Sequence, residues 1–555
     1  GSMYPGKEFL TRSAVLSLMI CHSWFCTGSF LGMAFVQPVA RFPSISQRSS
    51  VKIEELFALR GIDDTIDRSL KDGTSETSTL DILICGGGPS GLLTSIMLAQ
   101  KFPKSKIQVH DRQPTPPSPR DELIWGDTSK FYLIGLGGRG LSSLEAYGVD
   151  VLPFTVPVPG RKDWTPEQPN GVELFRTDRK YGTQVLPRDK LVSILHEHVQ
   201  ENYSDRIELN YQSIVRPVNF DYSVNGNEPK VLVEVSAVGE EQTWRPVVAD
   251  LVVASEGSAR TFANQMEKLD QGNPDPFRVV RFEDDNVRVY KTLPFRLPEL
   301  GWNITTPVPK TVFWNYAVRS PEGRVIFDAL PANDQGDYVG VLLMRGDDEM
   351  AQPHVDPATF LKFLEDNIPQ FLPLLDPEVI ATAAKSGSSS LPQFRYVTPR
   401  MHQGKRTILL GDTAHTVKPF FGMGANSALE DVKIFGKCID ESRGNLTEAI
   451  LTFSNRRAPD IAVLVQTSRD LDRPGVLGVF YFLIPVILDG IFQKLASQIF
   501  KPNIISMIQN EEYTFIEAVQ RKQLDRIGQL VSLGGFFYLL TTAIVSAYGV
   551  LAGLF

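Results

Sequence analysis

Two short apolar runs, separated by a turn and a helical pattern, form the most regular part of the chain. The first run covers residues 81–85, and a helical pattern follows from Leu92 to about Lys101. The second run covers residues 106–110. Short apolar runs bounded by turn residues are typical of buried parallel strands, and the pattern between them is typical of a helix that packs on those strands. The sequence therefore predicts a strand–helix–strand unit that begins near Leu80.

A second strand–turn–helix pattern lies far downstream. The apolar run 407–410 stops at Gly411-Asp412. A glycine-rich stretch, residues 419–426, then leads into a helix that we expect over residues 427–438.

The C-terminal end is the longest uncharged part of the chain. No charged residue occurs from Ile527 to Phe555, and ~20 apolar residues are enough for a helix to cross a bilayer. Basic residues precede this stretch, at Arg521, Lys522 and Arg526, so the positive-inside rule places the body of the protein on the cytosolic or stromal side. The alternative is a buried core helix. A shorter uncharged stretch, residues 475–488, predicts an interfacial helix or the roof of a substrate channel, with a buried core helix as the alternative.

The N-terminal residues have the layout of a targeting segment. Gly1-Ser2 is typical of a tag remnant, and a basic stretch with Lys7 and Arg12 precedes an apolar run. Residues 32–38 resemble the Ala-Phe-x-Pro junction of plastid presequences in diatoms and related algae. We therefore predict that residues 1–50 are a tag remnant plus a chloroplast transit presequence, with an N-terminal membrane anchor as the alternative.

Composition excludes several classes of protein. The chain has 555 residues and a net charge of −8, which argues against nucleic acid as the main partner. Its four cysteines, Cys21, Cys26, Cys85 and Cys438, show no disulfide framework and no metal-ligand spacing. We predict no metal site.

The first turn carries the pattern of a dinucleotide-binding site. Gly86 permits a tight turn, Gly88 allows the backbone to approach a pyrophosphate, and Gly91 allows the helix to pack close to the strand. Asp111 ends the next strand, twenty residues beyond Gly91, where an acid can hold the adenosine ribose. The helix N-terminus supplies amide groups and the positive end of its dipole.

The downstream turn suits a flavin. The carboxylate of Asp412 can accept hydrogen bonds from ribitol hydroxyls. The N-terminus of the following helix can face the electron-rich pyrimidine edge of the flavin ring.

The phrase from Gly411 to Asp431, which includes Pro-Phe-Phe-Gly and an asparagine, resembles the flavin signature of group A flavoprotein monooxygenases. Among these it is most similar to the kynurenine 3-monooxygenases, and the resemblance extends over most of the chain from Leu80, including residues 513–521 before the apolar tail. It implies FAD and NADPH as cofactors and O2 as co-substrate. It also implies that a flavin C4a-hydroperoxide transfers one oxygen atom to an aromatic, kynurenine-like substrate.

The resemblance also implies site residues, although it assigns no catalytic acid or base. Where the family has the aspartate of an Asp-Gly motif, this chain has Glu256. The amino-acid carboxylate of a bound substrate is expected to contact Arg161, Tyr181 and Asn426. The cofactor-binding residues are expected to be Gly86, Gly88, Gly91, Asp111, Arg112, Arg139, Arg188, Glu256, Gly411, Asp412, Pro419, Gly422, Gly424, Ala425 and Asn426.

We therefore predict an α/β fold with a Rossmann-type FAD-binding domain, a mixed β-sheet substrate domain and a C-terminal helical membrane anchor. The FAD-binding domain is expected to comprise residues 78–150, 186–265 and 396–440. The substrate domain is expected from residues 151–185 and 266–395, followed by a helical region, 441–526, and a transmembrane helix, 527–555.

Two other functions stay open. One is an epoxidase or hydroxylase of a plastid isoprenoid such as a carotenoid, and the other is a flavin reductase that inserts no oxygen. A non-enzymatic membrane scaffold is a more distant reading. The expected location is a plastid membrane, with the mitochondrial outer membrane or endoplasmic reticulum as alternatives.

Overall fold

The computed structural model describes residues 79–552 except for 127–131, 166–167, 176–179, 223–228, 241–242, 283–287, 299–311, 321–322 and 473–477. The predicted presequence, residues 1–50, lies outside the described residues. Contacts group residues 77–555 into one compact unit.

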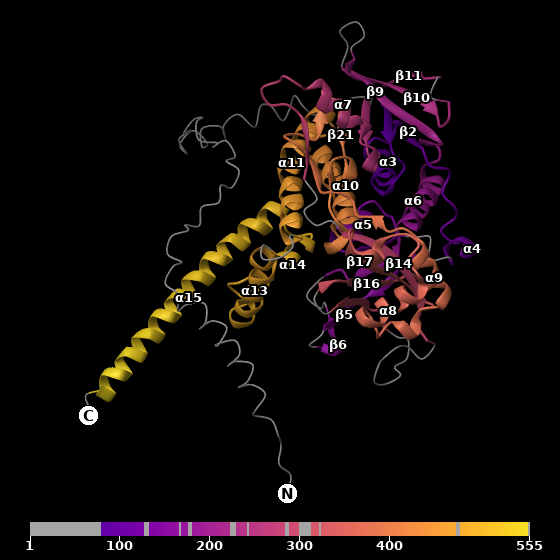
Figure 1. Ribbon diagram of the computed structural model, residues 1–555. Coiled ribbons are helices and arrows are strands. Elements are labelled where there is room, and N and C mark those ends of the chain that lie inside the picture. The colour runs from indigo at the N-terminus through magenta and orange to yellow at the C-terminus, as the bar shows by residue number, and fades with distance from the viewer. Residues whose placement is uncertain are drawn as a thin grey trace, which may run out of the picture. The chain divides into compact units, whose positions relative to one another are not determined.

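A six-stranded sheet forms the centre of the upper part of Figure 1. Its strand order is β20-β21-β12-β1-β2-β8, and every neighbouring pair is parallel except β20 with β21. The sheet draws on distant parts of the chain: β1 Asp81–Cys85, β2 Lys106–Asp111, β8 Ile207–Tyr211, β12 Leu251–Ala254, β20 His402–Gln403 and β21 Thr407–Leu409. The predicted strand–helix–strand unit is its centre.

Helices pack against one another and against this sheet. Helix α10 contacts α3, α5 and α11, and α3 also contacts α6. A continuous run of α3, Ser90–Ala99, is buried, as expected for a helix enclosed between a sheet and other helices. The bounds are α3 Pro89–Lys101, α5 Gly138–Glu145, α6 Arg188–Tyr203, α7 Thr261–Leu269, α10 Met423–Glu441 and α11 Leu446–Leu471.

A seven-stranded sheet, in the order β18-β14-β17-β16-β15-β5-β6, forms the second layer and is antiparallel except where β15 meets β5. Its side chains alternate with period two. One face, with Tyr316, Phe327 and Leu342, packs in a core that includes residues of α8 Pro357–Asn367 and α9 Pro377–Lys385. The bounds are β5 Gly160–Thr165, β6 Gln168–Phe175, β14 Arg288–Arg296, β15 Asn315–Arg319, β16 Ile326–Pro331, β17 Asp337–Arg345 and β18 Ser389–Ser390.

Three small sheets complete the body. Strands β9 Ser213–Tyr222, β10 Lys230–Ala237 and β11 Arg245–Ala249 form one of them, which lies beside the six-stranded sheet. The second contains β3 Leu133–Leu136, β4 Val156–Val158 and β7 Thr183–Pro187. The third contains β13 Arg278–Arg281, β19 Arg395–Thr398 and β22 His415–Thr416. A short helix, α4, covers Glu122–Trp125. The predicted α/β class with mixed sheets is confirmed.

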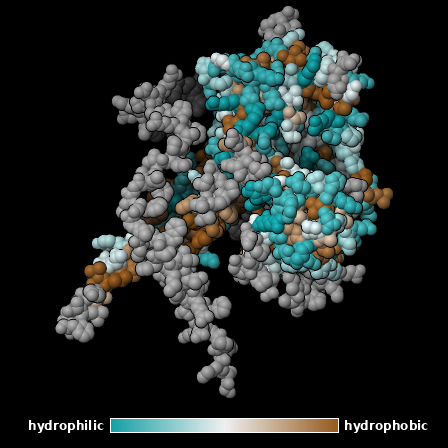
Figure 2. Space-filling model, viewed as in Figure 1, coloured by the Kyte–Doolittle hydropathy of each residue, from teal (hydrophilic) through white to brown (hydrophobic). Residues whose placement is uncertain are grey.

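The C-terminal part is helical. A π-helical turn, Val479–Leu483, leads into α13 Ile484–Leu495, and α14 Ile504–Gln509 precedes the last helix, α15 Phe515–Ala552. Helix α15 extends away from the sheets in Figure 1, and Figure 2 shows hydrophobic surface on the C-terminal helices. Over Phe515–Ala547 it is long and apolar enough to cross a membrane, and the most apolar window of that stretch is not buried. The helix begins twelve residues before the predicted start at Ile527, because the basic segment before the apolar stretch is also helical.

Candidate functional site

A cavity of about 1720 Å³ lies between the two large sheets. Its lining begins at the turn after β1, passes the turn before α10 and ends on the face of the seven-stranded sheet opposite its core. Pockets for one small ligand are usually ~300–1,000 Å³. The cavity therefore has room for a dinucleotide and a second, smaller molecule.

The turn after β1 requires glycine at two positions. Gly86 has φ +105°, and a Cβ there would lie 2.3 Å from the carbonyl oxygen of Ser255. A Cβ on Gly91 would lie 1.8 Å from the carbonyl oxygen of Gly86. Any side chain at either position would push α3 and β12 away from the turn. Gly88 lines the cavity as the N-cap of α3, which no side chain caps.

Asp111 lies at the C-terminal end of β2, and its Oδ2 accepts a hydrogen bond from the amide nitrogen of Gly87 at 2.6 Å. The carboxylate therefore also fixes the glycine turn, which is a contact that the sequence analysis did not anticipate. Its neighbour Arg112 is exposed and lines the same part of the cavity.

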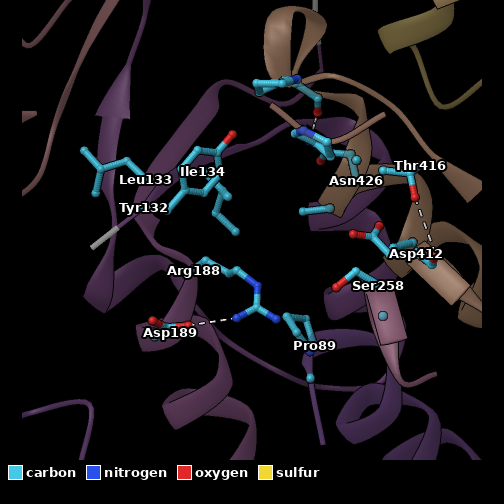
Figure 3. Close-up of a pocket in the computed structure, with 18 of the residues that line it drawn as sticks. Pro89, Tyr132, Leu133, Ile134, Arg188, Asp189, Ser258, Asp412, Thr416 and Asn426 are labelled. Atoms are coloured by element: carbon cyan, nitrogen blue, oxygen red, sulfur yellow. Dashed lines mark hydrogen bonds and ion pairs between the residues drawn. The ribbon is translucent and has the colours of Figure 1, made fainter. Parts of the chain in front are cut away.

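The second turn follows β21 at the same, C-terminal edge of the six-stranded sheet and lies beside α3, where a Cβ on Gly411 would be 2.8 Å from Ser90 Oγ. Gly411 has φ +63° and donates its amide hydrogen to Asp431 Oδ2 at 2.8 Å. This turn directs the side chain of Asp412 into the cavity, where it faces Arg188 (Figure 3). Asp412 is open to the cavity but deeply surrounded by protein, and this burial raises the pKa of its carboxyl group.

The N-terminus of α10 also opens on the cavity. Gly422 is its N-cap with φ +64°, and no side chain caps the helix. Pro419, Gly422, Gly424 and Ala425 all line the cavity. Uncapped amide groups at the start of a helix attract negative charge.

Arg188 begins α6 and points into the cavity (Figure 3). Its Nη1 is 2.8 Å from Asp189 Oδ1, and its side chain is half exposed. A Cβ on Gly88 would lie 3.8 Å from Arg188 Nη2, so the guanidinium lies beside the first glycine turn.

Glu256 follows β12 and lines the cavity. Its Oε1 accepts a hydrogen bond at 2.9 Å from the amide nitrogen of Phe262 in the first turn of α7. Burial raises the pKa of this carboxyl group to about 7, so a neutral acid and a carboxylate are both present near neutral pH. The position where the family has aspartate is thus filled by a side chain that caps a helix.

The side-chain amide of Asn426 makes four hydrogen bonds to the protein backbone. Its Oδ1 accepts hydrogen bonds from the amide nitrogens of Gly137 and Gly140, at 2.8 and 3.1 Å. Its Nδ2 donates to the carbonyl oxygens of Gly135 and Gly422, at 2.8 and 2.6 Å. Both hydrogens of Nδ2 are thus used by backbone carbonyl groups, which leaves no free donor for the substrate carboxylate that Asn426 was expected to bind. Asn426 joins the β3–α5 segment to the turn before α10.

The guanidinium group of Arg139 also binds other parts of the protein. Its guanidinium forms an ion pair with Glu430 and donates hydrogen bonds to the carbonyl oxygens of Ile508, Asn510 and Tyr513, at 2.8, 2.7 and 2.6 Å. The side chain is almost completely buried. Arg139 borders the cavity, but its charged group points into the protein and ties α5 to the C-terminal helices instead of reaching towards a flavin.

The structure separates the two other residues that were expected to bind substrate. Arg161 on β5 lines the cavity, although it is already ion-paired with Asp163 and lies 3.6 Å from Asp328. Tyr181 is not among the cavity-lining residues, and its hydroxyl donates to Glu145 Oε2 at 2.6 Å. The expected Arg161–Tyr181 pair is therefore not assembled around one position.

Two residues that the sequence analysis did not single out hold the site together. Arg260, in the left-handed conformation at φ +52°, donates to the carbonyl oxygen of Asp412 at 2.6 Å and to the hydroxyl of Thr416. The hydroxyl of Ser255 donates to the carbonyl oxygens of Cys85 and Gly86, each at 3.1 Å. The spacing of residues in the sequence does not indicate that Arg260 adopts a left-handed conformation, so this role could not be predicted.

His415 lies in the flavin-like loop but is completely buried, with Nε2 2.8 Å from Asp431 Oδ2. This contact connects the loop to α10. Among the described residues, no group of three or more His, Cys, Asp or Glu side chains could hold a metal ion.

The residues present fit an FAD molecule. Two uncapped helix N-termini face the cavity, the glycine turn excludes any Cβ, and Asp111 and Asp412 line the cavity beyond the C-terminal ends of β2 and β21. Gly91 and Gly411 do not line the cavity; they shape the turns that do.

Comparisons with known proteins agree with this geometry. A family model described as an FAD binding domain matches residues 296–468. Kynurenine 3-monooxygenase of Salinispora arenicola is 25% identical over 460 residues, covering 80% of this chain and 91% of the relative. Kynurenine 3-monooxygenase of Dictyostelium discoideum is 23% identical over 364 residues, covering 65% of this chain and 70% of the relative.

Two solved structures share the fold. 2-Methyl-3-hydroxypyridine-5-carboxylic acid oxygenase superposes with a TM-score of 0.52 at 17% identity, covering 72% of this chain and 94% of that structure. CtdE in complex with FAD and a substrate superposes with a TM-score of 0.50 at 16% identity, covering 72% and 91%.

Proposed function

We propose that the chain is an FAD-dependent monooxygenase of the group A fold, related to the kynurenine 3-monooxygenases, and that it uses NADPH and O2 to hydroxylate a kynurenine-like aromatic substrate. When bound, FAD would accept the hydride and activate O2, so the protein's part is to position both molecules and to exclude water.

The continuity of the cavity is the observation that carries this proposal. The turn with Asp412 and the N-terminus of α10 lie between the dinucleotide turn and the wall formed by β14–β17. A flavin whose adenosine end lies at Asp111 and whose ring end lies at Gly422–Asn426 would present that ring to this wall. A monooxygenase needs this arrangement because the reactive part of the cofactor must meet the substrate.

The wall itself favours a small polar aromatic molecule over an isoprenoid. Its middle is apolar, with Leu330, Val339, Val341 and Leu343, and its edges carry charged side chains. Burying such charges against a hydrocarbon would cost several kcal/mol per ion. This argument disfavours a carotenoid-like substrate, although the apolar tail alone suits one.

NADPH enters the proposal through the resemblance of the sequence to the kynurenine 3-monooxygenases. The described residues contain one dinucleotide turn, which the FAD would occupy, so the nicotinamide cofactor is expected to bind in the open cavity. Glu256 and Arg112 lie there and are candidates for contact with it.

We also infer that α15 anchors the protein in a membrane and that α13 lies at the membrane surface. Ile484, Ile487, Ile491 and Leu495 are exposed along α13. The buried Asp489 of α13 contacts Lys522 Nζ and Gln529 Nε2 of α15, at 2.9 and 3.0 Å, so the two helices are held together. A location in plastids depends on the N-terminal residues alone and stays a prediction.

Anaerobic reduction of the bound flavin by NADPH, with and without L-kynurenine, tests this function. The full-length protein would be purified in detergent, and the loss of flavin absorbance would be followed by stopped flow. We expect kynurenine to accelerate reduction strongly, and hydroxylated product to appear once air is admitted.

The other outcomes separate the rival functions. Rapid reduction without any effect of kynurenine, and without product in air, would identify a reductase. Slow reduction that a carotenoid accelerates would identify an isoprenoid oxygenase. A protein that retains no flavin at all would contradict all three of these functions.

A further inference from the structure

Three arginines lie on the cavity face of the seven-stranded sheet. They are Arg161 on β5, Arg319 on β15 and Arg288 on β14. Their charges influence one another, because Arg161 and Arg288 both contribute to a lower pKa of Arg319, for which burial is the main cause. The three therefore belong to one electrostatic environment.

Two of these arginines already have carboxylate partners. Arg161 is paired with Asp163 and lies 3.6 Å from Asp328. Arg319 Nη1 lies 3.7 Å from Asp328 and donates to the carbonyl oxygen of Val318 at 3.2 Å. The aspartates largely neutralise these two guanidinium groups.

Arg288 differs from both. Its guanidinium group makes no hydrogen bond or ion pair with any described residue, although the residue is only partly exposed. Asp472 favours its charge from a distance, but the Asp472 carboxylate lies 3.2 Å from Lys418. Burial lowers the pKa of Arg288, yet a guanidinium remains charged near neutral pH.

The surroundings of Arg288 define what it can bind. Tyr290 lies two residues along β14 on the same face, and Leu343 of β17 is directly opposite Tyr290 in the register. Both line the cavity. A planar apolar group can therefore lie on Tyr290 and Leu343 while an anionic group reaches the guanidinium.

We propose that Arg288, rather than Arg161, binds the carboxylate of the aromatic substrate. This inference rests on the proposed function and adds the residue that selects for an anionic substrate. A partly buried cation without a protein partner gains more from an incoming carboxylate than a cation that must first give up an aspartate.

The test measures substrate binding to the FAD-loaded, full-length protein through the change in flavin absorbance. The probes are L-kynurenine, kynuramine, which lacks the carboxylate, and the pair benzoate and benzamide. In R288M we expect the Kd for kynurenine to rise on the order of 10- to 100-fold, with the Kd for kynuramine unchanged. In R288K we expect an intermediate rise, because lysine keeps the charge without the bidentate geometry.

Arg296→Met is the matched control. Arg296 lies on the same strand and is exposed, with its Nε 3.7 Å from Asp337, outside the cavity. The R296M variant should bind all four probes with the same Kd values as the unchanged protein. Folding of R288M is checked by its flavin content and its Tm. Because the Arg288 side chain has no partner among the described residues, the substitution leaves no described carboxylate unpaired.

Each outcome decides between the proposals. If kynurenine does not bind but benzoate binds more tightly than benzamide and R288M removes this preference, the kynurenine assignment fails and Arg288 stands. If R288M binds kynurenine normally while R161M does not, Arg161 is the anchor and the inference is overturned. A protein that binds neither carboxylate probe more tightly than its neutral partner also overturns it.

Discussion

Asp412 and Glu256 are two cavity carboxyl groups whose surroundings oppose their negative charge. Burial raises the pKa of both, that of Glu256 to about 7. Nearby cations, Arg188 and Arg260 for Asp412 and Arg112 for Glu256, act in the opposite direction. A hydroxyl-rich ligand would relieve this cost for Asp412, because its hydroxyl groups would donate to the carboxylate.

Asp412→Ala is expected to abolish retention of FAD. The substitution removes the acceptor at the ring end of the cavity while leaving the backbone contacts of Gly411 intact. The ratio of flavin to protein absorbance after purification should fall by at least about tenfold, as two or more lost charge-assisted hydrogen bonds imply. Asp347→Ala, at an exposed surface pair, is the control. A yellow D412A protein with an unchanged flavin spectrum would refute the role.

Glu256→Gln is expected to flatten the pH dependence of apoprotein stability. The folded-state pKa is raised from 4.5 to about 7. Between these values the folded protein keeps a proton that the unfolded chain has lost, so the free energy of unfolding falls as pH rises through this window. The glutamine stays neutral and can still accept from Phe262. We expect E256Q to gain up to about 3 kcal/mol relative to the unchanged protein above pH 7, and little below pH 4.5.

Thermal unfolding of the apoprotein between pH 4.5 and 8 measures this difference. Equal slopes for the two proteins across that range would show that Glu256 titrates normally. The same variant with FAD bound reports separately on whether the cofactor changes the carboxyl group's environment.

At the scale of elements, α10 is the helix that joins the site to the rest of the protein. Its N-terminus opens on the cavity, and Asn426 holds it to β3 and α5. One turn later Glu430 and Asp431 contact the buried Arg457 of α11, at 2.9 and 2.7 Å. Arg457 also lies 2.9 Å from Asp460, which accepts from the amide nitrogen of Ile516 in α15. A buried charge network therefore links the flavin turn to the start of the last helix.

Asn426→Ala is expected to weaken this junction. The substitution leaves the amide groups of Gly137 and Gly140 without their acceptor, which should cost about 2–4 kcal/mol of stability and lower FAD affinity. Asn426→Asp keeps that acceptor and should lose less. Differential scanning fluorimetry and flavin titration measure both effects. If N426A instead kept its Tm and flavin but raised the KM for substrate alone, Asn426 would be a substrate ligand after all.

At the scale of the whole molecule, α15 changes character along its length. Its first turns are packed into the body, with Phe515 and Ala518 buried, whereas the residues from Ile527 onward are largely exposed and apolar. Lys522 and Gln529 hold α13 through Asp489. The apolar part of α15 is thus continuous with the turns that complete the buried charge network.

Truncation after Leu530 is expected to separate these two parts of α15. The shortened chain keeps Gln529 and every contact to Asp489, but it loses most of the exposed apolar helix. We expect it to leave the membrane fraction, either fully or after a mild salt wash, while retaining FAD. Fractionation and flavin content measure the two properties. Membrane retention equal to that of the full chain would place the anchor elsewhere, with the apolar face of α13 as the first candidate.

Several features of this protein could be predicted from the sequence because their causes are local. Gly86 and Gly91 leave no room for a Cβ, and an apolar stretch without charges needs no tertiary partner to suit a bilayer. Short-range spacing therefore predicted the turns, the order of strand and helix, and the last helix.

Side-chain partners were decided only by the tertiary structure. Asn426 lies 286–289 residues from the amide groups that it binds, and Arg139 lies 369–374 residues from its carbonyl partners. A charged or amide side chain binds whichever partners the fold brings within about 3 Å, and the sequence does not record those distances. For the same reason, the pairing of Arg161 and the lack of a partner for Arg288 became visible only when distant strands formed one sheet.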